Sequence, residues 1–239
     1  MEPVRSVLIT GAGSGIGHAT ALELARAGML VVATGRRLEP LSALVSEIIA
    51  SGGSAVAYPL DVRDAQDVLR VVRAVEQSSG PIDVLVANAG IHDAASILDG
   101  DPDKWRQVIE TNVLGVINCC HAVLPGMHER RAGHIVIISS TAGRIANTGE
   151  PVYVATKHAT VGLAEALRQS GAPLGIRVTL IEPGVVDTEI AKNPFAQTLR
   201  ASLTPLSPDD VARAIRFAIE QPQNCSINEI MLRPTNQVL

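Results

Sequence analysis

The 239-residue sequence predicts an α/β protein with one doubly wound, mostly parallel sheet of about seven strands and helices on both faces. Short apolar runs rich in β-branched residues alternate with longer amphipathic stretches along the whole chain. The apolar runs are nearly continuous, as expected for strands that helices cover on both faces. No linker, repeat or low-complexity segment interrupts this alternation, so residues 1–239 are expected to form a single domain.

The expected elements follow one another in order. Strands are predicted over 6–10, 29–34, 55–62, 82–90, 134–140, 176–184 and 227–234. Helices are predicted over 15–28, 39–53, 64–80, 103–128, 151–171 and 207–222. The stretch 185–206 shows no periodic pattern, and a long excursion after a strand is typical either of a substrate loop or of a plain surface loop.

Helix boundaries rest on residues that start or stop helices. Gly28 closes the first helix, and Pro40 lies near the first turn of the second. Ser207 is a plausible N-cap of the last helix, with Pro208 directly after it. Pro125 is expected to end or bend the long helix 103–128, because proline lacks the amide that a helix interior needs.

Composition excludes several classes of protein. Hydrophobic residues make up 46% of the chain and aromatic residues 2%, so the core must be aliphatic. The net charge of −4 argues against a nucleic-acid surface. Three cysteines form no disulfide framework, and the chain shows neither a signal peptide nor a run of about 20 apolar residues. We therefore expect a soluble cytoplasmic protein without a membrane or metal site.

The segment TGAGSGIG, residues 10–17, lies between the first strand and the first helix. Its glycines are spaced as Gly11, Gly15 and Gly17, with Ile16 where the common G-x-G-x-x-G pattern has its third glycine. Glycine lets the backbone approach a ligand closely, and a helix N-terminus offers free amides to phosphate. The alternative is a tight turn without a ligand, but the strand–helix context favours dinucleotide binding.

Polar and turn residues follow the later strands, at Asp61, Asn88-Ala89-Gly90, Ser139-Ser140-Thr141 and Pro183-Gly184. Each group alone is ordinary turn chemistry. In a doubly wound sheet, however, ligands bind beyond the carboxyl ends of the strands. We therefore expect these groups to lie along one edge of the sheet.

Tyr153 and Lys157 are four residues apart on a predicted helix, so their side chains share one face. A free tyrosine has a pKa of about 10, and ionisation at pH 7 costs roughly 4 kcal/mol. A nearby ammonium contributes about 1 kcal/mol in water and up to about 4 kcal/mol at a semi-buried site. A packed tyrosine beside a solvated lysine remains the alternative, but the pair can also act in acid–base chemistry.

These motifs together resemble the short-chain dehydrogenase/reductase family. Thr10-Gly-x-x-x-Gly-x-Gly17, Asn88-Ala-Gly90, Asn112, Ser140, Tyr153-x-x-x-Lys157 and Pro183-Gly184 follow the family's order and approximate spacing over essentially the whole chain. The resemblance implies a Rossmann-type sheet that binds NAD(P), with Tyr153 as acid/base. It implies that Lys157 holds the nicotinamide ribose and lowers the pKa of Tyr153, that Ser140 orients the substrate oxygen, and that Asn112 anchors a water of a proton relay.

The resemblance also implies a set of cofactor contacts. Asp61 would bond the adenine amino group, Asn88 would lie beside the adenosine ribose, and Thr188 would reach the nicotinamide amide or the phosphates. The full set of expected cofactor-binding residues is Gly11, Ser14, Gly15, Ile16, Gly17, Arg36, Arg37, Asp61, Val62, Asn88, Ala89, Gly90, Tyr153, Lys157, Pro183, Gly184, Val186 and Thr188.

The end of the second strand favours NADP(H) over NAD(H). The position that usually carries an acid in NAD enzymes is Gly35, and Arg36 and Arg37 follow it. Arginine binds a 2′-phosphate through several N–H donors, whereas an acid would repel it. Many NADP-dependent relatives also carry a basic residue in the glycine loop, where this chain has Ser14.

The expected activity is hydride transfer between NADP(H) and the carbonyl or alcohol group of a small substrate. The tail NEIMLRPTNQ resembles NADP-dependent reductases of short 3-hydroxy acids, serine-like compounds and aldehydes. Alternatives are a ketoacyl-carrier-protein-type reductase, an NADP-binding regulatory protein without turnover, and an epimerase or dehydratase. His92, Arg144 and Glu150 are possible pocket residues without an assigned role. The resemblance also implies a homotetramer paired through the helices 103–128 and 151–171.

Overall fold

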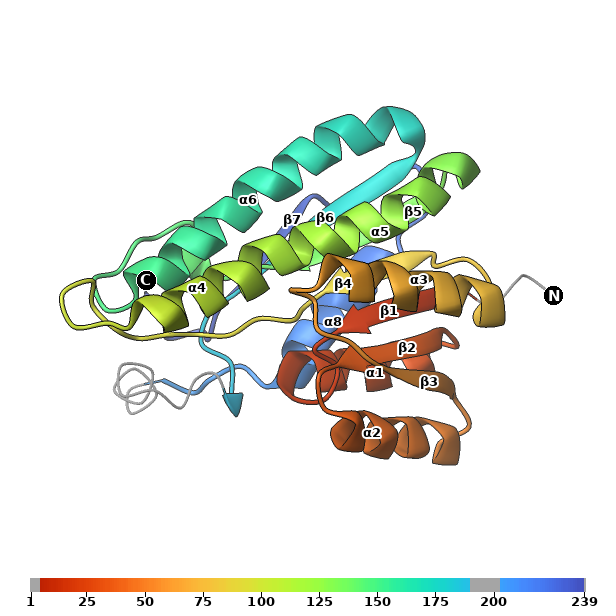
Figure 1. The fold of residues 1–239 in the computed structure, drawn as a ribbon, viewed down its shortest axis with the longest axis horizontal. Helices are drawn as coiled ribbons and strands as arrows, with labels where there is room; N and C mark the ends of the chain where they lie inside the picture. The colour runs from red at the N-terminus through yellow and green to blue at the C-terminus, as the bar shows by residue number, and fades with distance from the viewer. Residues whose placement is uncertain (1–4, 190–202, 239) are drawn as a thin grey trace.

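A single parallel sheet of seven strands forms the centre of the protein (Figure 1), in a computed structural model that describes residues 5–189 and 203–238. The strand order is β3-β2-β1-β4-β5-β6-β7, and every neighbouring pair is parallel. The strands are β1 (Ser6–Thr10), β2 (Leu30–Gly35), β3 (Ser54–Pro59), β4 (Val84–Ala87), β5 (Gly133–Ile138), β6 (Ile176–Pro183) and β7 (Glu229–Leu232). This confirms the doubly wound sheet that the apolar runs predict.

Helices cover both faces of the sheet. The α-helices are α1 (Gly15–Arg26), α2 (Leu38–Ala50), α3 (Ala65–Ser79), α4 (Pro102–Ile109), α5 (Gly115–Arg130), α6 (Pro151–Gly171) and α8 (Pro208–Ile219). Short segments of other helix types are η1 (Glu110–Leu114, a π-helix), η2 (Thr141–Gly143) and η3 (Ala172–Leu174, both 3₁₀). Helices α1, α2 and α8 pack on one face, and α3, α5 and α6 on the other.

The core is aliphatic, as the low aromatic content predicts. Strand residues alternate between the two faces: Leu8 packs under α3, α5 and α6, whereas Val7 and Ile9 pack under α1, α2 and α8. All three side chains are at most 1% exposed. Complete burial of one such side chain contributes about 1.5–3 kcal/mol, which explains why β1 is apolar on both faces.

The long helical stretch differs from its prediction. It runs from Pro102 to Arg130 without a break, and Pro125 lies inside α5 rather than at its end. Residue 125 removes the hydrogen bond to the carbonyl of His121, but both residues are exposed and water can satisfy that carbonyl. The irregular turn is instead η1, a π-helical segment of the kind often found at functional sites.

The combined helix Pro102–Arg130 is long and apolar enough to cross a membrane by composition alone. In this fold it lies against the sheet instead. Val116, Val123 and Met127 of α5 are buried in the core cluster that includes Leu85 of β4 and Ile135 of β5. The apolar character of this helix is therefore that of an element that covers a sheet.

The ends of the segment 185–206 lie next to each other. Val186 forms an isolated parallel bridge with Leu206, and the amide of Leu206 donates to the carbonyl of Val185 at 3.0 Å. Most of the expected substrate loop falls in 190–202, outside the described residues, so its role stays a prediction.

The glycine turn between β1 and α1 is packed tightly against the loop after β4. Gly11 and Gly15 have φ values of +67° and +54°, which favour glycine. A Cβ on Gly17 would lie 2.4 Å from the carbonyl oxygen of Gly11 and 2.6 Å from Nδ2 of Asn88. The turn therefore has no room for a side chain at position 17.

Gly17→Ala should lower the free energy of unfolding by about 1–3 kcal/mol, because the added methyl group meets backbone that cannot move aside. Gly35→Ala is the matched control, since a Cβ there would meet only Leu41, at 3.7 Å. We expect it to change stability by no more than about 0.5 kcal/mol. Urea denaturation of both variants at one protein concentration measures the difference, and equal stabilities would contradict this account of the turn.

Candidate active site

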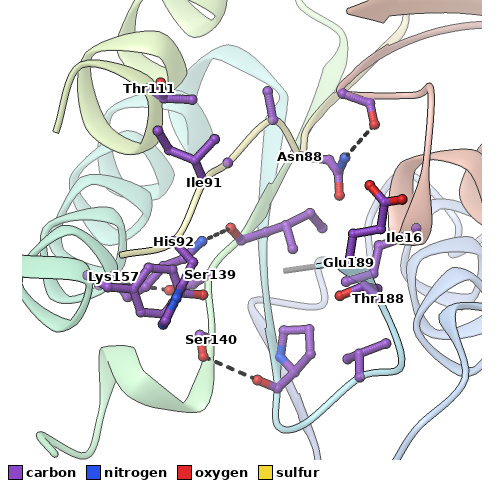
Figure 2. A pocket seen from close by; sticks show the side chains of 18 of the residues that line it. Ile16, Asn88, Ile91, His92, Thr111, Ser139, Ser140, Lys157, Thr188 and Glu189 are labelled. Carbon is purple, nitrogen blue, oxygen red and sulfur yellow. Dashed lines mark hydrogen bonds between the residues drawn. The ribbon is translucent and has the colours of Figure 1, made fainter. Parts of the chain in front are cut away.

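A cavity of about 620 Å³ runs along the carboxyl ends of the strands, where the strand order turns back between β1 and β4. Figure 2 shows His92, Ser140 and Lys157 on one side of it, and Ile16, Thr188 and Glu189 on the other. The predicted site residues that line it are Gly11, Ser14, Gly15, Ile16, Arg36, Arg37, Asp61, Val62, Asn88, Ala89, Gly90, Ser140, Tyr153, Lys157, Pro183, Gly184, Val186 and Thr188.

Two predicted residues, Gly17 and Asn112, are absent from the cavity lining. Gly17 packs under the turn, as described above. Asn112 lies in η1 and is 2% exposed; its Oδ1 accepts from the amide of Ile91 at 2.9 Å. Its Nδ2 donates to the carbonyl of Ile91 at 2.9 Å and to Oγ1 of Thr156 at 3.2 Å. The Asn112 side chain thus ties the loop after β4 to α6, and its role as a water anchor stays a prediction.

Asn88 joins the two loops that form the floor of the cavity. Its Nδ2 donates to the carbonyls of Thr10 at 2.8 Å and Gly11 at 3.3 Å. In return, Oγ1 of Thr10 accepts from the amides of Asn88 at 3.0 Å and Ala89 at 2.9 Å. The side chain predicted to lie beside a ribose therefore also holds the ends of β1 and β4 together.

Helix α6 brings Tyr153 and Lys157 to the same face, as their spacing predicts. The Nζ of Lys157 lies 5.5 Å from the centroid of the Tyr153 ring and donates to the carbonyl of Ile138 at 3.0 Å. Lys157 is 7% exposed although it carries a charge. Burial lowers the pKa of Lys157 to about 8, because the interior disfavours the charged form.

The surroundings of Tyr153 favour its protonated form. Burial raises the pKa of Tyr153 well above its ordinary value, and the charge of Glu150 raises it further. A hydrogen bond with Ser140 acts in the opposite direction and lowers it. The predicted lowering of the Tyr153 pKa by Lys157 is not among these effects, and it stays a prediction for the cofactor-bound protein.

Ser140 lies directly after β5, at the start of η2. Its Oγ donates to the carbonyl of Pro183 at 3.4 Å and accepts from the amide of Ala142 at 3.1 Å. These contacts, together with the bond to Tyr153, fix the hydroxyl between the ends of β5 and β6 (Figure 2). The hydroxyl is therefore positioned to meet a group that also meets Tyr153.

At the other end of the cavity, the first turn of α1 lacks a side-chain cap. Ser14 occupies the N-cap position, but its side chain makes no capping hydrogen bond. The first amides of a helix then need another partner, and together with the helix dipole they favour an anion. The uncapped turn, next to glycines that hold no side chain over it, fits the diphosphate of a dinucleotide.

Strand β2 ends at Gly35, and Arg36 and Arg37 follow at the rim of the cavity, both exposed. No carboxylate stands at position 35, so nothing there would repel an additional phosphate. The residues at this end of the cavity therefore fit a dinucleotide with a 2′-phosphate on its adenosine ribose.

Arg63 is a cavity residue that sequence reasoning missed. Its Nη2 lies 2.6 Å from a carboxylate oxygen of Asp61. Hydrogen bonds from Arg63 are the main reason why the pKa of Asp61 is lowered, and the charge of Arg36 adds to this. The sequence signal for Arg63 was its position two residues after Asp61, because this spacing keeps both side chains in one turn after β3.

The opposite end of the cavity holds a polar cluster around Glu150. Nε2 of His92 contacts Oε2 of Glu150, and Nδ2 of Asn147 donates to the other carboxylate oxygen at 2.7 Å. The rings of His92 and Tyr153 meet edge to face, with centroids 4.6 Å apart. His92, Asn147 and Glu150 all line the cavity. Asn147 had no local signal in the sequence.

Arg144, the third residue without an assigned role, does not line the cavity. Its Nε lies 2.6 Å from Oε1 of Glu182, and its Nη2 lies 2.6 Å from Oε1 of Glu229. Glu182 is 1% exposed, so its charge requires a partner. Arg144 therefore ties η2 to β6 and β7 rather than reaching the cavity.

Comparison with known proteins identifies the family. A family model described as short chain dehydrogenase matches residues 5–198. An uncharacterized oxidoreductase of Listeria monocytogenes is 37% identical over 97% of this chain and 96% of its own length. Glycine betaine reductase ATRR of Emericella nidulans is 36% identical over 96% of this chain, which spans only 19% of that protein.

Solved structures agree with this identification. The closed form of serine dehydrogenase complexed with NADP+ matches with a TM-score of 0.92 and 33% identity, over 98% of this chain and 96% of the other. An alcohol dehydrogenase from the archaeon Thermococcus sibiricus, complexed with 5-hydroxy-NADP, matches with a TM-score of 0.90 and 28% identity, over 98% of both chains. Because the family model covers most of the chain, this protein belongs to the short-chain dehydrogenase family.

Proposed function

We propose that this protein is an NADP-dependent oxidoreductase that interconverts the carbonyl and alcohol groups of a small substrate. The observation that carries the proposal is the meeting of Tyr153, Ser140 and Lys157 at one end of a cavity whose other end presents an uncapped helix and two arginines. Serine dehydrogenase and the archaeal alcohol dehydrogenase, the structural relatives reported above, were both solved with NADP-type ligands.

Bound NADP(H) supplies or accepts the hydride. In the reduction, the phenol of Tyr153 donates a proton to the substrate oxygen, and Ser140 donates a hydrogen bond to the same oxygen. In the oxidation, the phenolate of Tyr153 takes the proton from the alcohol. Lys157 holds the ribose, and its ammonium stabilises the phenolate electrostatically.

The remaining charged groups lie at the end of the cavity where the adenosine part of the cofactor would bind. The amides of the first turn of α1 would bind the diphosphate, and Arg36 and Arg37 would bind the 2′-phosphate. Arg63 neutralises Asp61, so that this carboxylate does not repel the phosphate. A regulatory protein that only binds NADP would need these groups but not the buried Tyr153–Lys157 pair, which is why we favour an enzyme.

Tyr153→Phe should lower kcat by about 10²–10⁴-fold, because the variant has no phenol proton to transfer. The dissociation constant for NADPH should stay nearly the same, since the missing hydroxyl makes little ground-state contact with the cofactor. NADPH oxidation over a panel of small aldehydes, ketones and 3-oxo acids, together with a fluorescence titration of NADPH, measures both quantities. More than a tenth of the wild-type activity in this variant would refute the role of Tyr153.

The wild-type protein should prefer NADPH to NADH by roughly 10-fold or more in kcat/KM, because one charge-assisted hydrogen bond contributes about 1.5–3 kcal/mol. Rising salt should reduce this preference, since Arg36 and Arg37 are exposed. Gly35→Asp should reduce or reverse it by placing a carboxylate where the 2′-phosphate would lie. The Gly35→Ala variant is the control, with the same Cβ and no charge.

A wild-type preference for NADH would refute the cofactor assignment. A Gly35→Asp variant whose ratio equals that of Gly35→Ala would show that the 2′-phosphate lies elsewhere.

We also propose a homotetramer that pairs through α5 and α6. Ile109, Leu114 and Ile117 along the long helical stretch are exposed by 45%, 48% and 39%, respectively. A hollow between α5 and α6, lined by Leu124 and Leu167 among others, continues this apolar surface. Apolar residues grouped in this way are typical of a surface that another subunit covers.

Ile117→Glu should shift the assembly toward smaller species, because it places a charge in an apolar interface. Ile49→Glu on α2, where the wild-type side chain is 57% exposed, is the control and should leave the assembly unchanged. Sedimentation velocity at micromolar concentration measures both variants, and a wild-type monomer would contradict the proposal.

A further inference from the structure

A polar cluster next to Tyr153, the proposed acid, consists of His92, Asn147 and Glu150. None of the three takes part in the steps described so far. The side chains of His92 and Glu150 are only 8% and 10% exposed. Both carboxylate oxygens of Glu150 are engaged, one by Nε2 of His92 and the other by Nδ2 of Asn147 at 2.7 Å. The rings of His92 and Tyr153 also pack against each other in a T-shaped arrangement, with centroids 4.6 Å apart.

A buried carboxylate beside a phenol has a definite electrostatic effect. Burial of a charge is costly unless partners compensate it, and Glu150 has two such partners. A negative charge close to a phenol disfavours a second negative charge on the phenolate oxygen. The carboxylate therefore opposes the action of the Lys157 ammonium on the same ring.

We propose that His92 and Glu150 act together as positioning residues for Tyr153. The His92 ring holds the phenol ring in place, and the Glu150 carboxylate keeps the phenol protonated. Protonated phenol is the form that a carbonyl reduction consumes, so the pair favours reduction over oxidation near neutral pH. This inference rests on the proposed role of Tyr153 as acid and base.

The other charged groups near Tyr153 agree with this assignment. Lys157 faces the ring from the next turn of α6, and Nζ lies 5.5 Å from the ring centroid. Arg144, at the end of η2, turns away to Glu182 and Glu229. Glu189 lies across the cavity beside Ile16 and Thr188 (Figure 2). Consistent with the geometry, the charge of Glu150 raises the pKa of Tyr153 in addition to the effect of burial.

The test is Glu150→Gln, which keeps an acceptor for Asn147 and removes the charge. Without the carboxylate, the pKa of Tyr153 must fall. The pH of half-maximal alcohol oxidation should therefore move down by about one unit, and the alkaline limit of carbonyl reduction should move down with it. The matched control is Glu165→Gln, the same substitution on an exposed residue of α6, and its pH profiles should equal those of the wild type.

His92→Phe tests the partner of the carboxylate. The phenylalanine ring keeps an aromatic contact with Tyr153 but offers no nitrogen to Glu150, so the carboxylate charge is less compensated at alkaline pH. Both pH profiles should then move up, opposite to those of Glu150→Gln. Opposite shifts distinguish an electrostatic role from a general loosening of the site, which would lower kcat without moving the profiles. Shifts in the same direction, or no shift, would overturn the inference.

A spectroscopic measurement tests the same point without turnover. The chain has two tyrosines, so Tyr58→Phe leaves Tyr153 as the only phenol. In that background, Glu150→Gln should show more tyrosinate absorbance at about pH 10–11 than the protein with Glu150, with circular dichroism to verify the fold. Equal absorbance would overturn the inference.

The two hypotheses fail in different ways. Retained activity in Tyr153→Phe would refute the proposed acid and base. Loss of activity in Tyr153→Phe, combined with unmoved profiles in Glu150→Gln, would refute only the role of His92 and Glu150.

Discussion

The contact on which the site depends is the close packing of the glycine turn after β1 against the loop after β4. Gly17 leaves room for the carbonyl of Gly11 and the amide of Asn88, and the Thr10 hydroxyl accepts two amides of the β4 loop. These bonds hold the ends of β1 and β4 together, at the point where the strand order of the sheet reverses. The floor of the cavity is consequently backbone, and ligand groups can approach it closely.

Charge is divided along the cavity. Three arginines, Arg36, Arg37 and Arg63, lie at the end of the cavity near β2 and β3. The carboxylate of Glu150 and the ring of His92 lie at the end near α6. Lys157, at the α6 end, is a buried cation, and the interior that surrounds it lowers its pKa to about 8. The end with the arginines is suited to bind anions. At the other end, a few closely packed groups around Tyr153 control proton transfer.

Burial raises the pKa of the Tyr153 phenol, so little phenolate is present near neutral pH to act as a base. The protonated phenol lines the cavity, where it can donate a proton to a bound group. Catalysis in both directions then depends on how nearby charges offset one another, and the fold supplies both signs through the Lys157 ammonium and the Glu150 carboxylate. The hydrogen bond between Ser140 and Tyr153 also lowers the pKa of the phenol, without adding a charge.

The sequence by itself determined the elements and most of the site, because these follow from local pattern. Continuous apolar runs predict covered strands, the spacing of Tyr153 and Lys157 places them on one helix face, and Gly35 before Arg36 predicts a phosphate site. It did not predict the π-helical turn at Asn112, or that the helix passes through Pro125, which exposure to water permits. Only the tertiary structure decided that His92 meets Glu150, 58 residues away, and that Arg144 meets Glu182, 38 residues away. Such pairs depend on how loops from different strands converge, and no periodicity in the chain records that geometry.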